Sequence, residues 1–230
     1  MAVIDALHAV QSRIADAARA AGRDPSEITL LPVSKFHPVS AIAELMGAGL
    51  GLFGENRLQE LADKKQQLPD ARFAMIGNVQ RNKAKLVVEY ADELHSLDSL
   101  SLAATLDRRL SEAGRRLPVL VQVNTSDEPQ KSGIAPEEAV EFAKALRGFP
   151  ALDVRGLMTM AINSPDEERV AACFRRLRDV QAELREAVPE LSWDQLSMGM
   201  SGDFELAIAH GSTMVRVGTA IFGARPDPAV

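Results

Sequence analysis

The sequence predicts one α/β domain over residues 1–230, a (β/α)8 barrel of the TIM type with an extra N-terminal helix. Strand-like and helix-like segments alternate along the chain until eight strands are counted. Each strand is apolar over several successive residues, as in a parallel sheet that is covered on both faces. The chain is slightly shorter than the ~250 residues typical of such barrels, so we expect short loops. An open doubly wound sheet is the alternative fold.

The extra helix is expected at residues 2–21, because apolar residues recur there at alternating spacings of four and three and mark one face. They are Val3, Leu7, Val10, Ile14, Ala17 and Ala21. Gly22 follows directly and ends the helix, since glycine favours the left-handed conformation at a helix C-terminus.

The β/α alternation follows this helix, and each expected strand is a short, largely apolar run. The expected strands cover residues 28–35, 50–56, 72–77, 93–97, 118–124, 152–160, 193–201 and 213–223. The expected helices cover residues 39–49, 57–67, 79–91, 101–114, 136–148, 165–187 and 202–211. In the first strand, Pro32 removes a backbone N–H donor, which predicts a local irregularity there.

Composition argues against several classes of partner. Lysine and arginine number 26 against 32 acidic residues, a net charge of −6, and aromatic residues make up 4%. Without a basic stripe or a stacking platform, we expect no nucleic-acid partner. No apolar run approaches the ~20 residues of a membrane span, and no signal-peptide pattern is present, so we expect a cytoplasmic protein. The single cysteine, Cys173, excludes an intrachain disulfide, and the histidines show no metal-ligand spacing.

A lysine at the end of the first strand is the first candidate for chemistry. The stretch LLPVSKFHP places Lys35 where a barrel strand meets its loop, and barrel active sites are built at these carboxyl ends. Burial beneath apolar neighbours lowers a lysine pKa and makes the neutral amine available to aldehydes. The alternative is a lysine whose charged end simply reaches solvent at the barrel rim.

Two later stretches favour an anion site. SMGMSGDF, residues 197–204, follows the seventh strand, and Ser201 is expected to cap the next helix. RVGTAIFG, residues 216–223, brings Gly218 and Thr219 to the end of the eighth strand. Barrels that bind phosphate usually do so in these two loops. The alternative is that these are only turn and cap residues.

Lys35 and the expected anion site are neighbours in a barrel, because the eighth strand closes against the first. An amine beside an anion site predicts a phosphorylated aldehyde as ligand. Pyridoxal 5′-phosphate is such a molecule. Arg216 on the eighth strand could direct its guanidinium at the pyridine nitrogen, and an ordinary ion pair in the barrel wall is the alternative.

Seven motifs are distributed in order over nearly the whole chain. They are LLPVSKFHPV, FGENRLQE, IGNVQRNKAK, HSLDS, VQVNTSDEPQKSGI, VRGLMTM and LSMGMSGDFELAIAHGSTMVRVGTAIFG. With them the sequence resembles the pyridoxal-phosphate homeostasis proteins, which are similar to the barrel domain of alanine racemase. The resemblance implies a vitamin B6 cofactor held on Lys35 as an internal aldimine, a Schiff base.

The resemblance also implies the other contacts with the cofactor. Phosphate contacts would come from Ser201, Gly218 and Thr219, with Met200 and Ser197 lining the loop, Arg216 facing the ring nitrogen and Asn56 near the cofactor. No residue is assigned a catalytic role.

Five residues are left without an assigned role. The family commonly has threonine and histidine where this chain has Phe36 and Ala74. Lys131, in the loop after the fifth strand, is either a secondary amine for handing the cofactor over or a solvated lysine. His37 and His95 lie near strand ends, where either could line the pocket.

The favoured function is to bind pyridoxal phosphate and so to support cofactor and amino-acid homeostasis. We expect a monomer, and apo forms of pyridoxal-phosphate enzymes are candidate recipients of the cofactor. An amino-acid racemase is the alternative. Alanine racemase uses a tyrosine from an additional domain, whereas Tyr90 is the only tyrosine here. An arginine at the ring nitrogen would also weaken the electron sink that racemisation needs. A lysine aldolase is a third possibility, but no carboxylate partner for proton transfer is evident.

Overall fold

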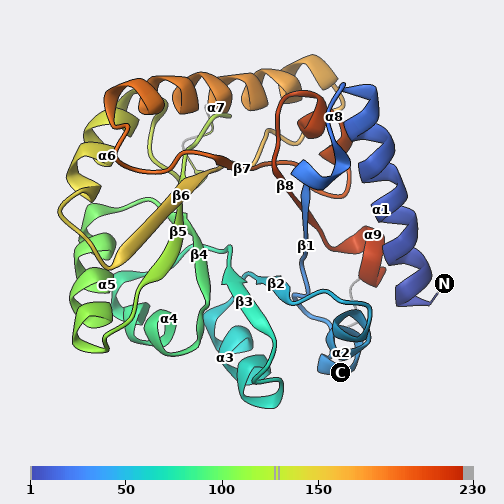
Figure 1. Cartoon of the computed structure of the whole chain (residues 1–230), viewed down its shortest axis with the longest axis horizontal. Helices are drawn as coiled ribbons and strands as arrows, with labels where there is room; N and C mark the ends of the chain where they lie inside the picture. The colour runs from blue at the N-terminus through green and yellow to red at the C-terminus, as the bar shows by residue number, and fades with distance from the viewer. Residues whose placement is uncertain (1, 127, 129, 225–230) are drawn as a thin grey trace.

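A computed structural model describes residues 2–126, 128 and 130–224. Eight parallel strands follow one another in the order β1-β8-β7-β6-β5-β4-β3-β2, with helices around them (Figure 1). The strands are β1 (Thr29–Pro32), β2 (Leu52–Glu55), β3 (Arg72–Met75), β4 (Glu93–Leu97), β5 (Leu117–Gln122), β6 (Leu152–Met158), β7 (Gln195–Ser197) and β8 (Met214–Val217). The predicted (β/α)8 barrel is confirmed. The open-sheet alternative is wrong, because β1 lies beside β8.

Nine α-helices are found in the described residues. They are α1 (Val3–Ala20), α2 (Val39–Gly47), α3 (Leu58–Gln67), α4 (Ala84–Tyr90), α5 (Leu100–Glu112), α6 (Ala139–Leu146), α7 (Glu167–Ala187), α8 (Phe204–Ala209) and α9 (Thr219–Phe222). The extra helix α1 lies outside the barrel against α8 and α9. It buries Leu7, Val10 and Ile14 of its predicted apolar face, whereas Val3 and Ala17 are only partly covered.

The barrel closes between β1 and β2 through one described bridge, Val33 with Gly54. Beyond it, the N–H of Ser34 donates to the carbonyl of Gly54 at 3.0 Å. On its other side, β1 pairs with β8 along its whole length, to Pro32 opposite Val217. Successive N–H groups of a strand point to opposite sides, so Pro32 lacks its donor on the side facing β2. Among the described residues, β1 and β2 are bridged next to Pro32, at Val33, and the irregularity expected at Pro32 stays a prediction.

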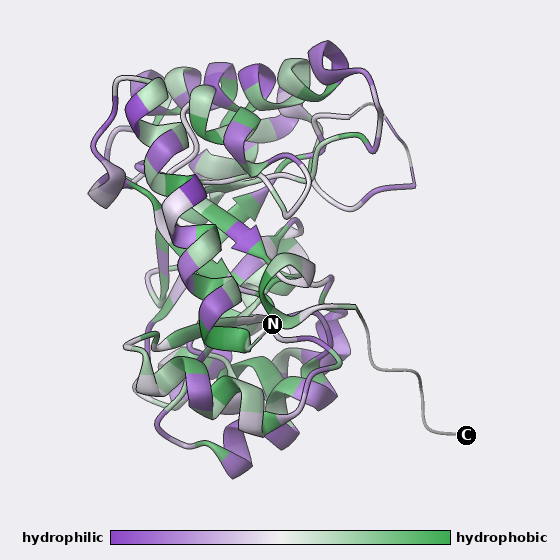
Figure 2. Ribbon diagram, turned by 90° about the vertical axis from the view of Figure 1, so that its right-hand side faces the viewer, coloured by the Kyte–Doolittle hydropathy of each residue, from purple (hydrophilic) through white to green (hydrophobic). Residues whose placement is uncertain are grey.

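Apolar side chains fill the space between the strands and the helices. Figure 2 shows hydrophobic residues along the strands, whereas the long helix α7 at the top carries many hydrophilic ones. Cys173 is buried in the apolar face of α7, as predicted. Inside the barrel, the fully buried Ala74 packs with Leu31 and Met214 in a smaller cluster. No helix in the described ranges is long and apolar enough to cross a membrane.

Candidate functional site

A cavity of about 280 Å³ lies at the carboxyl ends of the strands. We call it the carboxyl-end cavity. It brings together seven of the eight residues predicted to contact a cofactor, namely Lys35, Asn56, Met200, Ser201, Arg216, Gly218 and Thr219. These residues come from the loops after β1, β2 and β7, from β8 itself, and from the junction of β8 with α9. Residues more than 180 positions apart in sequence therefore share one site.

Lys35 lies at the second position of a tight turn that follows β1. The N–H of His37 donates to the carbonyl of Ser34 at 3.0 Å and closes the turn. Phe36, at the third position, has a φ of 68°, a conformation that glycine usually supplies in such turns. A non-glycine residue held this way costs about 1–3 kcal/mol. Lys35 is half-buried on the cavity wall.

Arg216 reaches the cavity from the barrel interior and is almost completely buried. Its guanidinium donates to the carbonyl of Thr159 at 2.8 Å and to the carbonyl and hydroxyl of Ser197 at 2.7 and 2.8 Å. These oxygens are neutral, so the arrangement differs from the barrel-wall ion pair considered above. Burial lowers the pKa of Arg216 to about 10, and the carboxylate of Asp203 opposes the shift. The guanidinium is therefore charged at neutral pH.

Ser197 takes a different place from the one expected. It is fully buried at the end of β7 and does not line the cavity. Its hydroxyl and carbonyl oxygens instead accept hydrogen bonds from Arg216. Ser197 therefore orients the arginine, because two oxygens of one residue fix the position of one Nη atom.

Asn56 lines the cavity and has one unpaired polar atom. Its Oδ1 is buried and has no hydrogen-bond partner within the described ranges. A buried acceptor without a partner is costly, and native proteins rarely leave one unsatisfied. A ligand with a donor at this place would remove that cost.

The loop after β7 is shaped by Gly199 and Asp203. Gly199 has a φ of 95°, and a Cβ there would lie 2.5 Å from the Cβ of Ala207. The Asp203 carboxylate accepts a hydrogen bond from the N–H of Met200 at 2.6 Å. Burial raises the pKa of Asp203, while this hydrogen bond and Arg216 lower it. The loop thereby presents Met200 and Ser201 at the cavity mouth.

The helix cap predicted at Ser201 is wrong. Helix α8 begins at Phe204, with Asp203 at its N-cap position, and residues 201–203 form a turn. The N–H groups of Asp203 and Phe204 both donate to the carbonyl of Met200 and close this turn. Gly202 and Asp203 therefore separate Ser201 from the first residue of α8. The hydroxyl of Ser201 lies at the cavity without being the cap.

The loop after β8 approaches β1 closely. A Cβ on Gly218 would lie 3.1 Å from the carbonyl oxygen of Val33, so glycine keeps the two strand ends together. Thr219 is the first residue of α9. Its backbone N–H and that of Gly218 have no intrahelical partner, as at any helix start.

Several cavity residues were not predicted from the sequence. Val33, Ile76, Met158 and Met160 supply an apolar wall. The sequence could have indicated these four residues, because they stand at the carboxyl ends of β1, β3 and β6, which meet at this face of the barrel. His37, which the sequence placed near a strand end as a candidate for the pocket wall, does line the cavity, and it stacks on Phe222 with 4.9 Å between ring centroids. Burial lowers the pKa of His37, and the cation of Lys64 adds to the shift.

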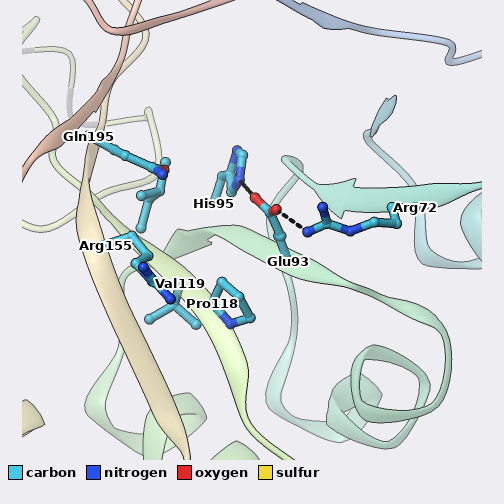
Figure 3. A pocket seen from close by; sticks show the side chains of 8 residues that line it. Arg72, Glu93, His95, Pro118, Val119, Arg155 and Gln195 are labelled. Atoms are coloured by element: carbon cyan, nitrogen blue, oxygen red, sulfur yellow. Dashed lines mark hydrogen bonds and ion pairs between the residues drawn. The ribbon is translucent and has the colours of Figure 1, made fainter. Parts of the chain in front are cut away.

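Figure 3 shows a second cavity, of about 150 Å³, formed near the amino ends of the strands. His95 lies there, with its Nε2 2.9 Å from Glu93, which also pairs with Arg72 at 2.7 Å. His95 therefore lines this cavity and not the one that contains Lys35. Lys131 also lies outside the carboxyl-end cavity. It pairs with Glu128 and donates to the carbonyl of Ala161.

Comparison with known proteins assigns the family. A family model described as alanine racemase, N-terminal domain, matches residues 6–226. A pyridoxal phosphate homeostasis protein of Pseudomonas aeruginosa is 46% identical over 220 residues, covering 94% of this chain and 93% of that protein. The Escherichia coli K12 protein of the same name is 45% identical and covers 94% of both. This chain belongs to the pyridoxal phosphate homeostasis protein family.

Solved structures include a similar protein with pyridoxal phosphate bound. PipY of Synechococcus elongatus, with pyridoxal phosphate bound, has a TM-score of 0.81 and 38% identity and covers 91% of this chain and 100% of PipY. An alanine racemase of Clostridium difficile has a TM-score of 0.72 at 17% identity, and this chain matches 56% of its length. The racemase thus shares the barrel fold with the pyridoxal phosphate homeostasis proteins.

Proposed function

We propose that this chain binds pyridoxal 5′-phosphate in the carboxyl-end cavity, with Lys35 as its covalent attachment point, and holds the cofactor in the cytoplasm for apo forms of pyridoxal-phosphate enzymes. The observation that carries this proposal is one cavity in which an amine, a buried guanidinium and two glycine- and hydroxyl-bearing loops meet. The relatives named for pyridoxal phosphate homeostasis support it. We propose a monomer as the working state.

The residues present fit this cofactor in size and polarity. The cavity volume of about 280 Å³ is close to the lower end of the ~300–1,000 Å³ range of small-molecule sites. The unpaired Oδ1 of Asn56 offers an acceptor. The charged guanidinium of Arg216 suits an acceptor such as an unprotonated pyridine nitrogen.

Each part of the cofactor has a proposed partner. Ser201, Gly218 and Thr219 would hold the phosphate through hydroxyl and backbone N–H donors. Arg216, oriented by Ser197, would donate to the ring nitrogen. The cofactor supplies an aldehyde that condenses with an amine to a Schiff base and releases water, and Lys35 is the amine that lines the cavity.

The racemase alternative is disfavoured by two observations. A charged Arg216 facing the ring nitrogen would keep that nitrogen unprotonated and weaken carbanion stabilisation. Tyr90 ends α4, where its hydroxyl lies 3.1 Å from the side-chain nitrogen of Gln66, outside the residues that line the cavity. It is therefore not positioned to exchange a proton with a bound amino acid.

The visible spectrum tests the proposed function. Purified protein mixed with pyridoxal phosphate should develop a yellow absorbance band that borohydride discharges. Protein that stays colourless after this treatment, with no cofactor retained on gel filtration, would contradict the proposal.

The phosphate contacts predict a selective loss of affinity. Replacing Ser201 and Thr219 with alanine should weaken pyridoxal phosphate binding by roughly 10- to 150-fold per lost hydrogen bond, because a charge-assisted bond contributes about 1.5–3 kcal/mol. Binding of unphosphorylated pyridoxal should change little. Fluorescence titration with both ligands measures the difference, and Ser111→Ala on the exposed surface of α5 is the control. Equal losses for both ligands would place the phosphate elsewhere.

A further inference from the structure

A buried cluster of charged side chains lies against the turn that carries Lys35, and the proposed function does not use it. We call it the Lys64 cluster; it comprises Ser34, Glu55, Glu60 and Lys64. Glu55 ends β2, and Glu60 and Lys64 are one helical turn apart on α3. The side chains of Lys64 and Glu55 are 7% and 0% exposed. Charges this deeply buried are rare unless they are paired.

Lys64 is bound in three directions. Its Nζ donates to the carbonyl of Ser34 at 2.7 Å, to Glu55 Oε1 at 2.6 Å and to Glu60 Oε1 at 2.7 Å. An ammonium group has three N–H donors, so each has an acceptor. The hydroxyl of Ser34 donates to the same Glu55 oxygen at 2.6 Å. The cluster therefore has one fixed arrangement.

The cluster holds the backbone on both sides of Lys35. The carbonyl of Ser34, in the peptide group before Lys35, accepts from Lys64 at 2.7 Å. The N–H of Phe36, in the peptide group after Lys35, donates to Glu60 Oε1 at 2.5 Å. Because peptide groups are planar, fixing both of them fixes φ and ψ of Lys35. The direction of its Cα–Cβ bond is then fixed as well.

Phe36 shows why the turn needs such support. Its φ of 68° is the one positive value found at a non-glycine residue in the described part of the chain. Bulky side chains rarely adopt this region. The hydrogen bond from Phe36 N–H to Glu60 is made in this conformation, so it favours the strained turn over relaxed alternatives.

We propose that Glu60, held by Lys64, is a positioning residue that keeps residues 34–37 in the strained turn and so directs the Lys35 amine into the carboxyl-end cavity. This inference rests on the proposed function of Lys35. Glu60 acts through the backbone and is not among the residues lining that cavity.

Glu60→Ala is the most selective variant. It leaves Lys64 paired with Glu55, whereas removal of Lys64 would leave a fully buried carboxylate without its cation, a strongly destabilising change. Glu60 is also the more exposed acid, at 20% against 0% for Glu55. Asp63→Ala is the matched control, because Asp63 is an exposed carboxylate on the same helix that bonds only to Gln59 among the described side chains.

Phe36→Gly provides the decisive background, since glycine adopts positive φ without strain. The experiment measures the rate at which pyridoxal phosphate becomes trapped on Lys35 by borohydride, by peptide mass spectrometry. Glu60→Ala should slow trapping about tenfold or more when residue 36 is phenylalanine, because misplaced reacting groups lose rate steeply. It should slow trapping less than about threefold in the Phe36→Gly background. Asp63→Ala should leave the rate near that of the unmodified protein.

Amide hydrogen exchange of the cofactor-free protein gives a second readout that does not depend on Lys35 chemistry. Glu60→Ala should speed exchange of the Phe36 amide about tenfold, whereas the Val33 amide, bonded to Val217 in β8, should not change. Equal slowing of trapping by Glu60→Ala in both backgrounds, or unchanged exchange at Phe36, would overturn the inference and leave the proposed function intact. Absence of trapping on Lys35 in the unmodified protein would instead overturn the proposed function and, with it, this role of Glu60.

Discussion

Lys35→Ala is expected to lose all covalently bound pyridoxal phosphate while keeping its fold. The side chain lies on a cavity wall and not in the apolar core, so its truncation removes the amine without leaving a void in the packing. Absorbance of the protein after incubation with cofactor and desalting measures the loss. Thermal unfolding by circular dichroism should give a midpoint close to that of the unmodified protein.

Lys131→Ala is the matched control for this experiment. Lys131 is bound to Glu128 and to the carbonyl of Ala161, outside the residues that line the cavity. We expect this variant to retain the cofactor absorbance. The assignment of Lys35 as the attachment point would be contradicted if Lys35→Ala kept the cofactor absorbance or if Lys131→Ala lost it.

The loaded protein is expected to racemise amino acids negligibly. With Tyr90 outside the cavity lining and a charged arginine proposed at the ring nitrogen, racemisation lacks a tyrosine as its second acid/base group, opposite Lys35, and an effective electron sink. Absence of one positioned acid/base group typically lowers the rate about 10²–10⁴-fold. Incubation with single-enantiomer alanine in deuterium oxide, followed by mass spectrometry and chiral chromatography, measures the rate. Rapid deuteration that disappears in Lys35→Ala would favour the racemase alternative.

Much of the fold was predictable because it depends on local patterns. Apolar runs and helical periodicity predicted all eight strands and the order of helices α1 to α8, whereas α9 lies within the range expected for the eighth strand. The rule that barrel sites form at carboxyl strand ends placed Lys35, Ser201 and Thr219 in one cavity.

The features that sequence reasoning missed depend on tertiary contacts. Lys64 occurs in the polar stretch LQELADKKQQ beside Lys65, and only the fold buries the first of the two more deeply. The family resemblance implied that Ser197 lines the loop, yet Ser197 ends β7 and bonds to Arg216 on the neighbouring strand β8. The positive φ of Phe36 had no sequence signal, because glycine or asparagine is the usual residue there.

Peptide mapping after borohydride reduction tests the central claim most directly. Protein loaded with one equivalent of pyridoxal phosphate is reduced, digested and analysed by tandem mass spectrometry. The structure predicts a phosphopyridoxyl group on Lys35, at the turn between β1 and α2. A phosphopyridoxyl group found on another lysine, with Lys35 unmodified, would contradict the assignment of the cofactor to the carboxyl-end cavity.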